Sequence, residues 1–242
     1  MLSTSTRKLI RSLSVKKYRE QEGLFIVEGI KMVEEAIRSD YTVKAIYAQD
    51  ASLFPDAVLV SQEEMSGISQ LKTPPPALAV LEAKNEDTDC HLPEKGQLYL
   101  GLDSIRDPGN FGSIIRIADW FGIKAIYASP DSVDLYNPKV VQASMGALFR
   151  LRIIYTDLGA LLTQTDVPVW GTLLEGESIY QTDVSDMGII LIGNEAHGLS
   201  PLLRQKMDRA LFIPPYPLHA SGAESLNAAM AAAIVCATFR RA

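Results

Sequence analysis

Between residues 97 and 242 the sequence alternates short apolar segments with segments of helical periodicity, and this alternation limits the possible folds more than any other feature. Strands that alternate with helices in this way pair in parallel, and the helices cover both faces of the sheet. We therefore predict an α/β fold here, with a parallel sheet and helices on both of its faces. The six predicted strands span residues 98–102, 124–128, 151–155, 167–174, 188–192 and 210–213.

A smaller α/β unit is predicted before this region. An apolar run over residues 24–28 ends at Gly29 and precedes a predicted helix at 30–38. Further strands are predicted at 43–47, 57–60 and 77–81. Residues 83–96 are polar, acidic and without periodicity, as in a linker. We expect a small domain over residues 1–90, a linker to about residue 96, and a second domain over residues 97–242.

Composition limits the class of protein. The hydrophobic content of 47% is ordinary, and no apolar run approaches the roughly 18 residues that a membrane helix needs. The basic start lacks the apolar core and cleavage site of a signal peptide, so a cytoplasmic location is expected. The two cysteines, Cys90 and Cys236, and the three histidines show no metal-ligand spacing. We therefore expect neither a disulfide framework nor a metal site.

Charge is distributed unevenly along the chain. The formal net charge of −6 argues against a protein that binds nucleic acid through its whole surface, yet the first 19 residues carry six basic side chains and no acid. This end of the chain could bind a polyanion, and a solvated basic terminus is the alternative. The six side chains are Arg7, Lys8, Arg11, Lys16, Lys17 and Arg19.

The first candidate site follows the strand at 98–102. Residues 107–109 read Asp-Pro-Gly, a strong turn signal, and Asn110 then stands where a helix N-cap is expected. Apolar residues at positions 114, 117, 118 and 121 predict one buried face of this helix. Arg116 lies off that face and should lean back over Gly112, beside the N-terminus of the helix, where a phosphate or another oxygen-rich ligand could bind. The alternative is a solvated surface arginine.

Two further loops follow predicted strands. Gly193 and Gly198 have the spacing of a phosphate-binding loop, but Leu199 stands where that motif requires lysine, so we reject a nucleotide site of that kind. A glycine-rich strand-to-helix turn is the alternative. The loop from residue 212 reads Phe-Ile-Pro-Pro-Tyr-Pro and precedes Ser225, a plausible cap of the last helix. Its prolines could stiffen the loop, so that its remaining backbone N–H and C=O groups could form hydrogen bonds with the edge of a flat ligand such as adenine.

Together these three elements resemble the SpoU/TrmH family of RNA ribose 2′-O-methyltransferases, within the SPOUT superfamily. Residues 110–116 read N-F-G-S-I-I-R and match the first family motif, N-x-G-x-x-x-R. Residues 191–195 with Gly198-Leu199 match the second motif, and Ile213-Pro214 with residues 225–227 match the third. The likeness covers about residues 97–242, and residues 19–38 resemble part of the small RNA-binding domain that many members carry.

The resemblance implies a deep C-terminal trefoil knot, a homodimer with active sites at its interface, and S-adenosyl-L-methionine bound in the knot loops without a metal. The implied cofactor contacts are Thr172, Leu173, Leu174, Gly193, Asn194, Ile213 and Leu226. The implied catalytic residues are Asn110, Arg116, Glu195, Ser225 and Asn227. Arg116 would assist deprotonation of the ribose hydroxyl or stabilise the developing alkoxide. Asn110 and Ser225 would orient the reacting groups. Glu195 would hold its own loop or the side chain of Asn227.

The expected substrate is structured RNA, with ribosomal RNA favoured over transfer RNA because of the N-terminal domain. The alternatives are a transfer RNA ribose methyltransferase, a methyltransferase with another target, and a non-catalytic RNA-binding or ribosome-assembly protein that retains the fold. One departure concerns the third motif, which commonly reads I-P-M. Here Pro215 replaces the methionine and the loop at 216–224 is longer, which affects the rim of the expected pocket.

Overall fold

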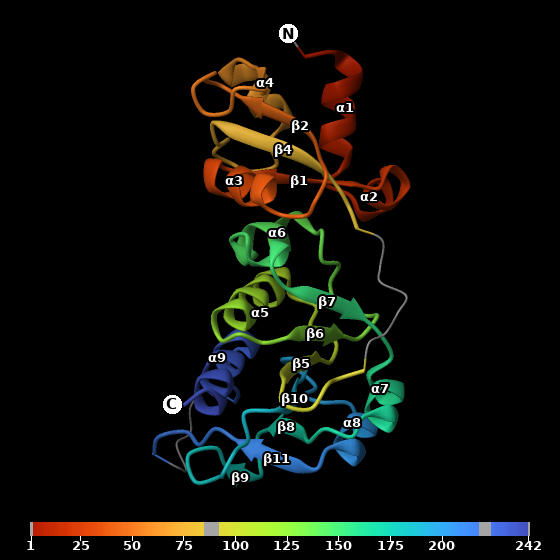
Figure 1. The fold of residues 1–242 in the computed structure, drawn as a ribbon, viewed down its shortest axis with the longest axis vertical. Helices are drawn as coiled ribbons and strands as arrows, with labels where there is room; N and C mark the ends of the chain where they lie inside the picture. The colour runs from red at the N-terminus through yellow and green to blue at the C-terminus, as the bar shows by residue number, and fades with distance from the viewer. Residues whose placement is uncertain (1, 85–91, 218–223, 242) are drawn as a thin grey trace. The chain divides into compact units, whose positions relative to one another are not determined.

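The computed structural model describes residues 2–84, 92–217 and 224–241 (Figure 1). The middle of the predicted linker, with Cys90, and positions 218–223 of the proline-rich loop lie outside the described residues. The described chain divides into two compact units. The first contains residues 2–84 and Asp134–Arg150, and the second contains residues 92–133, 151–217 and 224–241.

The first unit is a four-stranded sheet with helices, and all of its predicted strands are present. The strands are β1 (Leu24–Glu28), β2 (Val43–Ala48), β3 (Val58–Leu59) and β4 (Ala77–Glu82), in the order β1-β4-β2-β3. Strand β4 is antiparallel to β1 and β2, whereas β3 is parallel to β2. The helices before residue 84 are α1 (Thr4–Ser12), α2 (Lys16–Glu22), α3 (Ile30–Arg38) and α4 (Gln62–Ile68). The basic start of the chain is therefore folded into α1 and α2.

The segment Asp134–Arg150 packs with the first unit, although it falls within the predicted second domain. It contains α6 (Pro138–Ser144) and a 3₁₀ turn, η1 (Ala147–Phe149), and α6 contacts β1. Aromatic rings add to this packing, because Tyr136 lies against Phe25 with ring centroids 4.4 Å apart. Side-chain contacts between distant positions, which leave no periodic signal in the sequence, decide where this segment belongs.

A buried ion pair also joins this segment to the first unit. Arg19 is only 5% exposed, donates a hydrogen bond of 2.9 Å to the Leu13 carbonyl oxygen, and forms a salt bridge with Asp134. Removing one partner of a buried pair leaves an uncompensated charge, which is far more costly than losing an exposed pair.

The second unit contains a seven-stranded sheet in which all neighbouring strands are parallel. Its order is β7-β6-β5-β10-β8-β11-β9. The strands are β5 (Leu98–Leu102), β6 (Ala125–Ala128), β7 (Arg152–Tyr155), β8 (Val169–Leu173), β9 (Glu177–Ser178), β10 (Gly188–Ile192) and β11 (Arg209–Phe212). All six predicted strands are confirmed with ends within two residues, and the two-residue edge strand β9 was too short to be recognised in the sequence.

Helices flank this sheet on both faces, as predicted. They are α5 (Pro108–Trp120), α7 (Leu158–Gln164), α8 (Pro201–Lys206) and α9 (Ala228–Phe239). Figure 1 shows α5 and α9 together beside one face of the sheet, and α7 and α8 together beside the other. The central strands β5 and β10 are buried along their whole length because they are covered on both faces. No helix within the described part of the chain is long and apolar enough to cross a membrane.

Two predicted helix caps were wrong. The side chain of Asp107, not Asn110, caps α5, because its Oδ1 accepts a hydrogen bond of 2.8 Å from the Asn110 backbone N–H. Helix α5 therefore begins at Pro108, and the Asn110 side chain is free for another role. In the same way Asn227, not Ser225, caps α9 by accepting hydrogen bonds from the N–H groups of Ala229 and Met230.

The buried face of α5 is wider than predicted. Ile114 and Ala118 are buried as expected, but Ile117 and Phe121 are only half-buried, and Phe111 and Ile115 are buried instead. The helix packs against α9 as well as the sheet, so it needs a broad apolar stripe.

Replacing Asp134 with alanine should lower the free energy of unfolding by roughly 3 kcal/mol, because the buried Arg19 guanidinium would lose its charged partner. The double change of Arg19→Met and Asp134→Leu should cost much less. Urea unfolding followed by far-ultraviolet circular dichroism measures both. Glu20→Ala is the matched control, since it breaks the exposed Lys16–Glu20 pair of 3.5 Å. Equal effects of Asp134→Ala and Glu20→Ala would contradict the structural role of the buried pair.

Candidate active site

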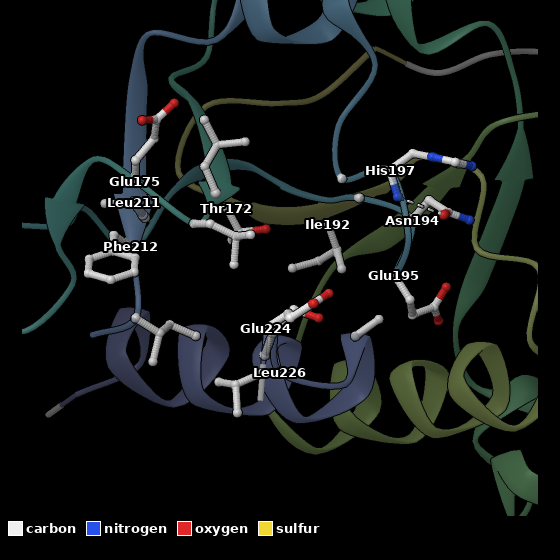
Figure 2. A pocket seen from close by; sticks show the side chains of 18 of the residues that line it. Thr172, Glu175, Ile192, Asn194, Glu195, His197, Leu211, Phe212, Glu224 and Leu226 are labelled. Carbon is white, nitrogen blue, oxygen red and sulfur yellow. Dashed lines mark hydrogen bonds between the residues drawn. The ribbon is translucent and has the colours of Figure 1, made fainter. Parts of the chain in front are cut away.

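A cavity of about 940 Å³ lies at the carboxyl ends of β8, β10 and β11, beside the start of α9. Figure 2 shows the side chains of Thr172, Ile192 and Phe212 around it, each from a different strand. In open α/β sheets ligands bind at this edge, and the volume is that of a site for a small molecule. All seven residues expected to contact the cofactor line this one cavity. They are Thr172, Leu173, Leu174, Gly193, Asn194, Ile213 and Leu226.

The loop after β10 is closed tightly on itself. Asn194 and Gly198 exchange two backbone hydrogen bonds of 2.8 and 3.1 Å. A Cβ atom at Gly193 would lie 2.3 Å from the backbone carbon of Gly198, closer than any real contact. Gly198 itself adopts a left-handed conformation with φ of 66°. Both glycines are therefore required by the shape of the loop. This requirement explains why Gly193 and Gly198 have the spacing of a phosphate-binding loop although the loop lacks the lysine of that motif.

The side chain of Asn194 fixes this loop from within. Its Oδ1 accepts hydrogen bonds of 2.9 Å from the Ala196 N–H and 3.2 Å from the His197 N–H. Its Nδ2 donates a hydrogen bond of 2.8 Å to the Ser104 carbonyl oxygen, in the loop after β5. Asn194 thus acts on the cavity both as part of its lining and as the support of the loop.

Three of the five predicted catalytic residues form one hydrogen-bonded chain. Asn227 Nδ2 donates to Asn110 Oδ1 over 2.8 Å, and Asn110 Nδ2 donates to Glu195 Oε1 over 2.6 Å. The chain joins the starts of α9 and α5 to the loop after β10. Glu195 therefore holds Asn110 directly, and it holds Asn227 through Asn110. The sequence had left open whether Glu195 holds its own loop or Asn227.

Within the described residues, the other two predicted catalytic residues form no hydrogen bond with this chain. Ser225 lines the cavity and is exposed. Arg116 is exposed, is not among the residues that line the cavity, and has no hydrogen bond or ion pair to another described residue. The structure thus confirms that Arg116 lies off the buried face of α5 but does not bring its side chain into the cavity of its own chain.

Four acidic or basic side chains of the lining were not assigned from the sequence. They are Glu175, His197, Arg204 and Glu224. Glu175 lies just beyond the end of β8, so its position after a predicted strand is the sequence feature that could have identified it as a site residue. With Glu195, the two other glutamates place three carboxylates around the cavity, an arrangement suited to a ligand that carries positive charge.

Within residues 2–84, 92–217 and 224–241, no group of three or more His, Cys, Asp or Glu side chains is placed to hold a metal ion. His91 and His219 lie outside these residues. Burial raises the pKa of the Cys236 thiol to about 12, so this cysteine stays protonated near neutral pH and is not a nucleophile.

The six basic residues of the N-terminus do not all remain available to a partner. Lys8, Arg11, Lys16 and Lys17 are exposed, and Arg7 is half-buried. Arg19 is buried and paired with Asp134, so its role is structural. A basic sequence run shows that positive charge is present, but burial decides which of its members can meet a polyanion.

Known proteins resemble this chain in sequence and in fold. Residues 97–237 match the SpoU rRNA Methylase family, and residues 6–79 match the MRM3-like substrate binding domain. The chain is 31% identical over 240 residues to a 23S rRNA (guanosine(2553)-2'-O)-methyltransferase of Bacillus subtilis, across 93% of this chain and 92% of that protein.

Solved structures of other proteins are similar to the fold of this chain over nearly its whole length. A putative RNA methyltransferase of the TrmH family from Porphyromonas gingivalis is 36% identical with a TM-score of 0.86, covering 99% of this chain and 98% of that one. An AdoMet-bound rRNA methyltransferase from Sinorhizobium meliloti is 28% identical with a TM-score of 0.87, covering 99% and 95%.

Replacing Gly193 with alanine should lower the free energy of unfolding by roughly 1–3 kcal/mol, because the new Cβ would overlap the Gly198 backbone and force the loop open. Thermal unfolding measures the change. Gly67→Ala in α4 is the matched control, since its Cβ would meet nothing closer than 3.4 Å and alanine favours a helix. Equal melting temperatures for the two variants would show that the loop is not closed as described.

Proposed function

Because the chain belongs to the SpoU rRNA methylase family, we propose that it transfers a methyl group from S-adenosyl-L-methionine to a ribose 2′-hydroxyl of ribosomal RNA. The observation that carries this proposal is the hydrogen-bonded chain Asn227–Asn110–Glu195 at the rim of a cavity of cofactor size. A non-catalytic protein that kept only the fold would have no need to keep these side chains joined.

The cavity fits the cofactor in size and in chemistry. S-adenosyl-L-methionine, when bound, supplies an electrophilic methyl group on a positively charged sulfur, and three carboxylates line the cavity. Backbone groups of residues 172–174, Gly193 and Ile213 would contact it, together with Asn194 and Leu226, and the support for this is that all of these residues line the cavity. The Thr172 hydroxyl already donates 2.7 Å to the Leu191 carbonyl oxygen, so the contribution of Thr172 comes from its backbone.

The remaining catalytic task is to activate and hold the ribose hydroxyl. This hydroxyl is a poor nucleophile near neutral pH, so its proton must be removed or its developing negative charge stabilised. A guanidinium scarcely loses its proton, and we assign Arg116 to charge stabilisation. Asn110 and the exposed Ser225 hydroxyl would orient the reacting groups, with Asn110 held in place by Glu195 and Asn227.

The second unit would act as a homodimer through α5 and α9. Helix α9 contains no charged residue, and four of its five exposed or half-buried positions, Met230, Ala233, Ile234 and Ala237, follow the i, i+3, i+4, i+7 spacing of one helix face. Trp120 at the end of α5, which packs beside α9, is 84% exposed. An apolar surface of this kind is covered by a partner in soluble proteins. Arg116 lies on the same helix as Trp120 and would act at a site shared between the two subunits.

The first unit would bind the RNA. Its support is the match of residues 6–79 to a substrate binding domain and the exposure of four basic side chains on α1 and α2, which are Lys8, Arg11, Lys16 and Lys17. Contacts of lysine and arginine with phosphates supply affinity without base specificity, so these residues would position the RNA. Arg7 can contribute only in part, and Arg19 is excluded from this surface by its burial.

The remaining expectations complete the proposal. We place the substrate domain at residues 1–90 and the methyltransferase domain at 97–242, which the two family matches support. The deep C-terminal knot is supported by the insertion of β10 between β5 and β8 and by the return of α9 to α5 after β11. The reaction requires no metal, and ribosomal RNA as substrate is consistent with a cytoplasmic location.

Arg116→Ala should lower methyl transfer to ribosomal RNA by about 100-fold or more, because a positive charge would be missing where the alkoxide develops. Its affinity for S-adenosyl-L-methionine should change less than about threefold, since Arg116 does not line the cavity. Ribose methylation mapped in a deletion strain, complemented by each variant, identifies the nucleotide and tests the function. Arg38→Ala, at another exposed arginine, is the control. Full activity of Arg116→Ala would refute its assigned role.

Met230→Glu should convert the dimer to a monomer, because the 61% exposed side chain leaves the fold intact while the new charge would be buried at the interface. Sedimentation velocity measures the oligomeric state. Leu202→Glu on α8 is the control, since Leu202 is 52% exposed on the other face of the sheet and should leave the dimer unchanged. A monomeric wild type, or a Met230→Glu dimer, would contradict the proposed interface.

A further inference from the structure

A second cluster of hydrogen bonds joins the loops after β5 and β6, beside the cavity but outside its lining. At its centre is Asp131, whose two carboxylate oxygens are both occupied. Oδ2 accepts hydrogen bonds of 2.6 Å from the Ser104 hydroxyl and 2.9 Å from the Arg106 guanidinium. Oδ1 accepts one of 2.7 Å from the Ser129 hydroxyl. The cluster therefore ties the residues that follow β5 to those that follow β6.

The hydrogen bonds of this cluster hold Ser104 in an unusual backbone conformation. Its φ of 57° lies in the left-handed region, which residues other than glycine adopt only at a cost in free energy. Its backbone N–H donates a hydrogen bond of 2.8 Å to Ser129 Oγ, and its own hydroxyl donates to Asp131. Asp131 thus acts on Ser104 twice, once directly and once through the hydroxyl of Ser129.

The conformation of Ser104 in turn reaches the cavity. Its carbonyl oxygen accepts the hydrogen bond from Asn194 Nδ2, and the opposite end of that amide accepts from the N–H groups of Ala196 and His197. A rotation of the Ser104 peptide would move the acceptor away and release the Asn194 amide. The loop held by that amide contains Glu195, which holds Asn110.

The charge state of Asp131 agrees with this geometry. The hydrogen bond from the Ser104 hydroxyl, followed by those from Ser129 and Arg106, lowers the pKa of the Asp131 carboxyl to about 2, against the opposing effect of partial burial. Asp131 is therefore ionised throughout the neutral range, and all three of its donors are bound to a full negative charge.

We propose that Asp131 is a positioning residue of the methyl-transfer site, which holds the cofactor loop in its binding conformation through Ser104 and Asn194 without touching cofactor or RNA. The inference rests on the proposed function, because it concerns the cavity assigned to S-adenosyl-L-methionine. It adds a residue that lies outside the three family motifs and outside the cavity lining.

The test compares cofactor affinity in a set of variants of the full chain. Asp131→Ala should raise the Kd for S-adenosyl-L-methionine, measured by calorimetry, roughly five- to tenfold. Asp131→Asn, which keeps one acceptor oxygen, should show a smaller loss and serves if the alanine variant folds poorly. In steady state the KM for the cofactor should rise while the KM for RNA stays unchanged, a split that general destabilisation of the fold would not produce.

Rescue provides the sharper test. Glycine adopts a φ near 57° without steric cost, so adding Ser104→Gly to Asp131→Ala should restore most of the cofactor affinity. In an Asn194→Ala background, Asp131→Ala should add no more than about a twofold loss, because the link that transmits its effect is already absent. The control is Asp50→Ala, whose carboxylate accepts a hydrogen bond of 2.8 Å from the Ser52 N–H within the first unit.

The outcomes separate this inference from the function on which it rests. A wild type that binds no S-adenosyl-L-methionine would refute the proposed function, and the positioning role with it. A wild type that binds normally, with unchanged affinity in Asp131→Ala, would overturn only the role of Asp131. A loss in Asp131→Ala that Ser104→Gly does not restore would overturn the route through Ser104.

Discussion

The hydrogen-bonded chain Asn227–Asn110–Glu195 is the interaction on which the site depends. Its members lie 117 and 85 positions apart in the sequence, and each belongs to a different element at the carboxyl edge of the sheet. Asn110 is available for this chain only because Asp107 caps α5, whereas Asn227 both caps α9 and joins the chain. Two helix starts and one loop are thereby fixed relative to one another.

The neighbouring loops are also held by hydrogen bonds between their own polar groups. The Gly193–Gly198 loop closes on its own backbone, Asn194 fills it from within, and Ser104 and Asp131 support Asn194 from the next loops along the edge. The side chains of Asn110, Asn194 and Asn227 are therefore already hydrogen-bonded within the protein. A site organised in this way loses little conformational freedom on binding, which favours both affinity and the alignment needed for transfer.

Periodicity in the sequence was sufficient to predict most of the fold. The strands of both units were located within about two residues, because a buried strand is a short apolar run and a flanking helix has one apolar face. The errors occurred where several residues could serve the same local purpose. Asp107 and Asn110 are both good N-caps, as are Ser225 and Asn227, and only the first turn of the folded helix selects between them. Arg19 was grouped with five other basic residues, and only tertiary packing shows that it is buried.

The sequence by itself determined the α/β architecture, the order of the strands along the chain and the three motifs that identify the family, because these depend on periodicity and on residues close together in the chain. The tertiary structure decided which loops meet, which polar groups are already bonded and which charges remain free. It grouped Asp134–Arg150 with the first unit, joined Asn110 to Glu195, and linked Asp131 to the loop after β10 through Ser104. These relations depend on hydrogen bonds and packing between distant positions, and no local pattern records them.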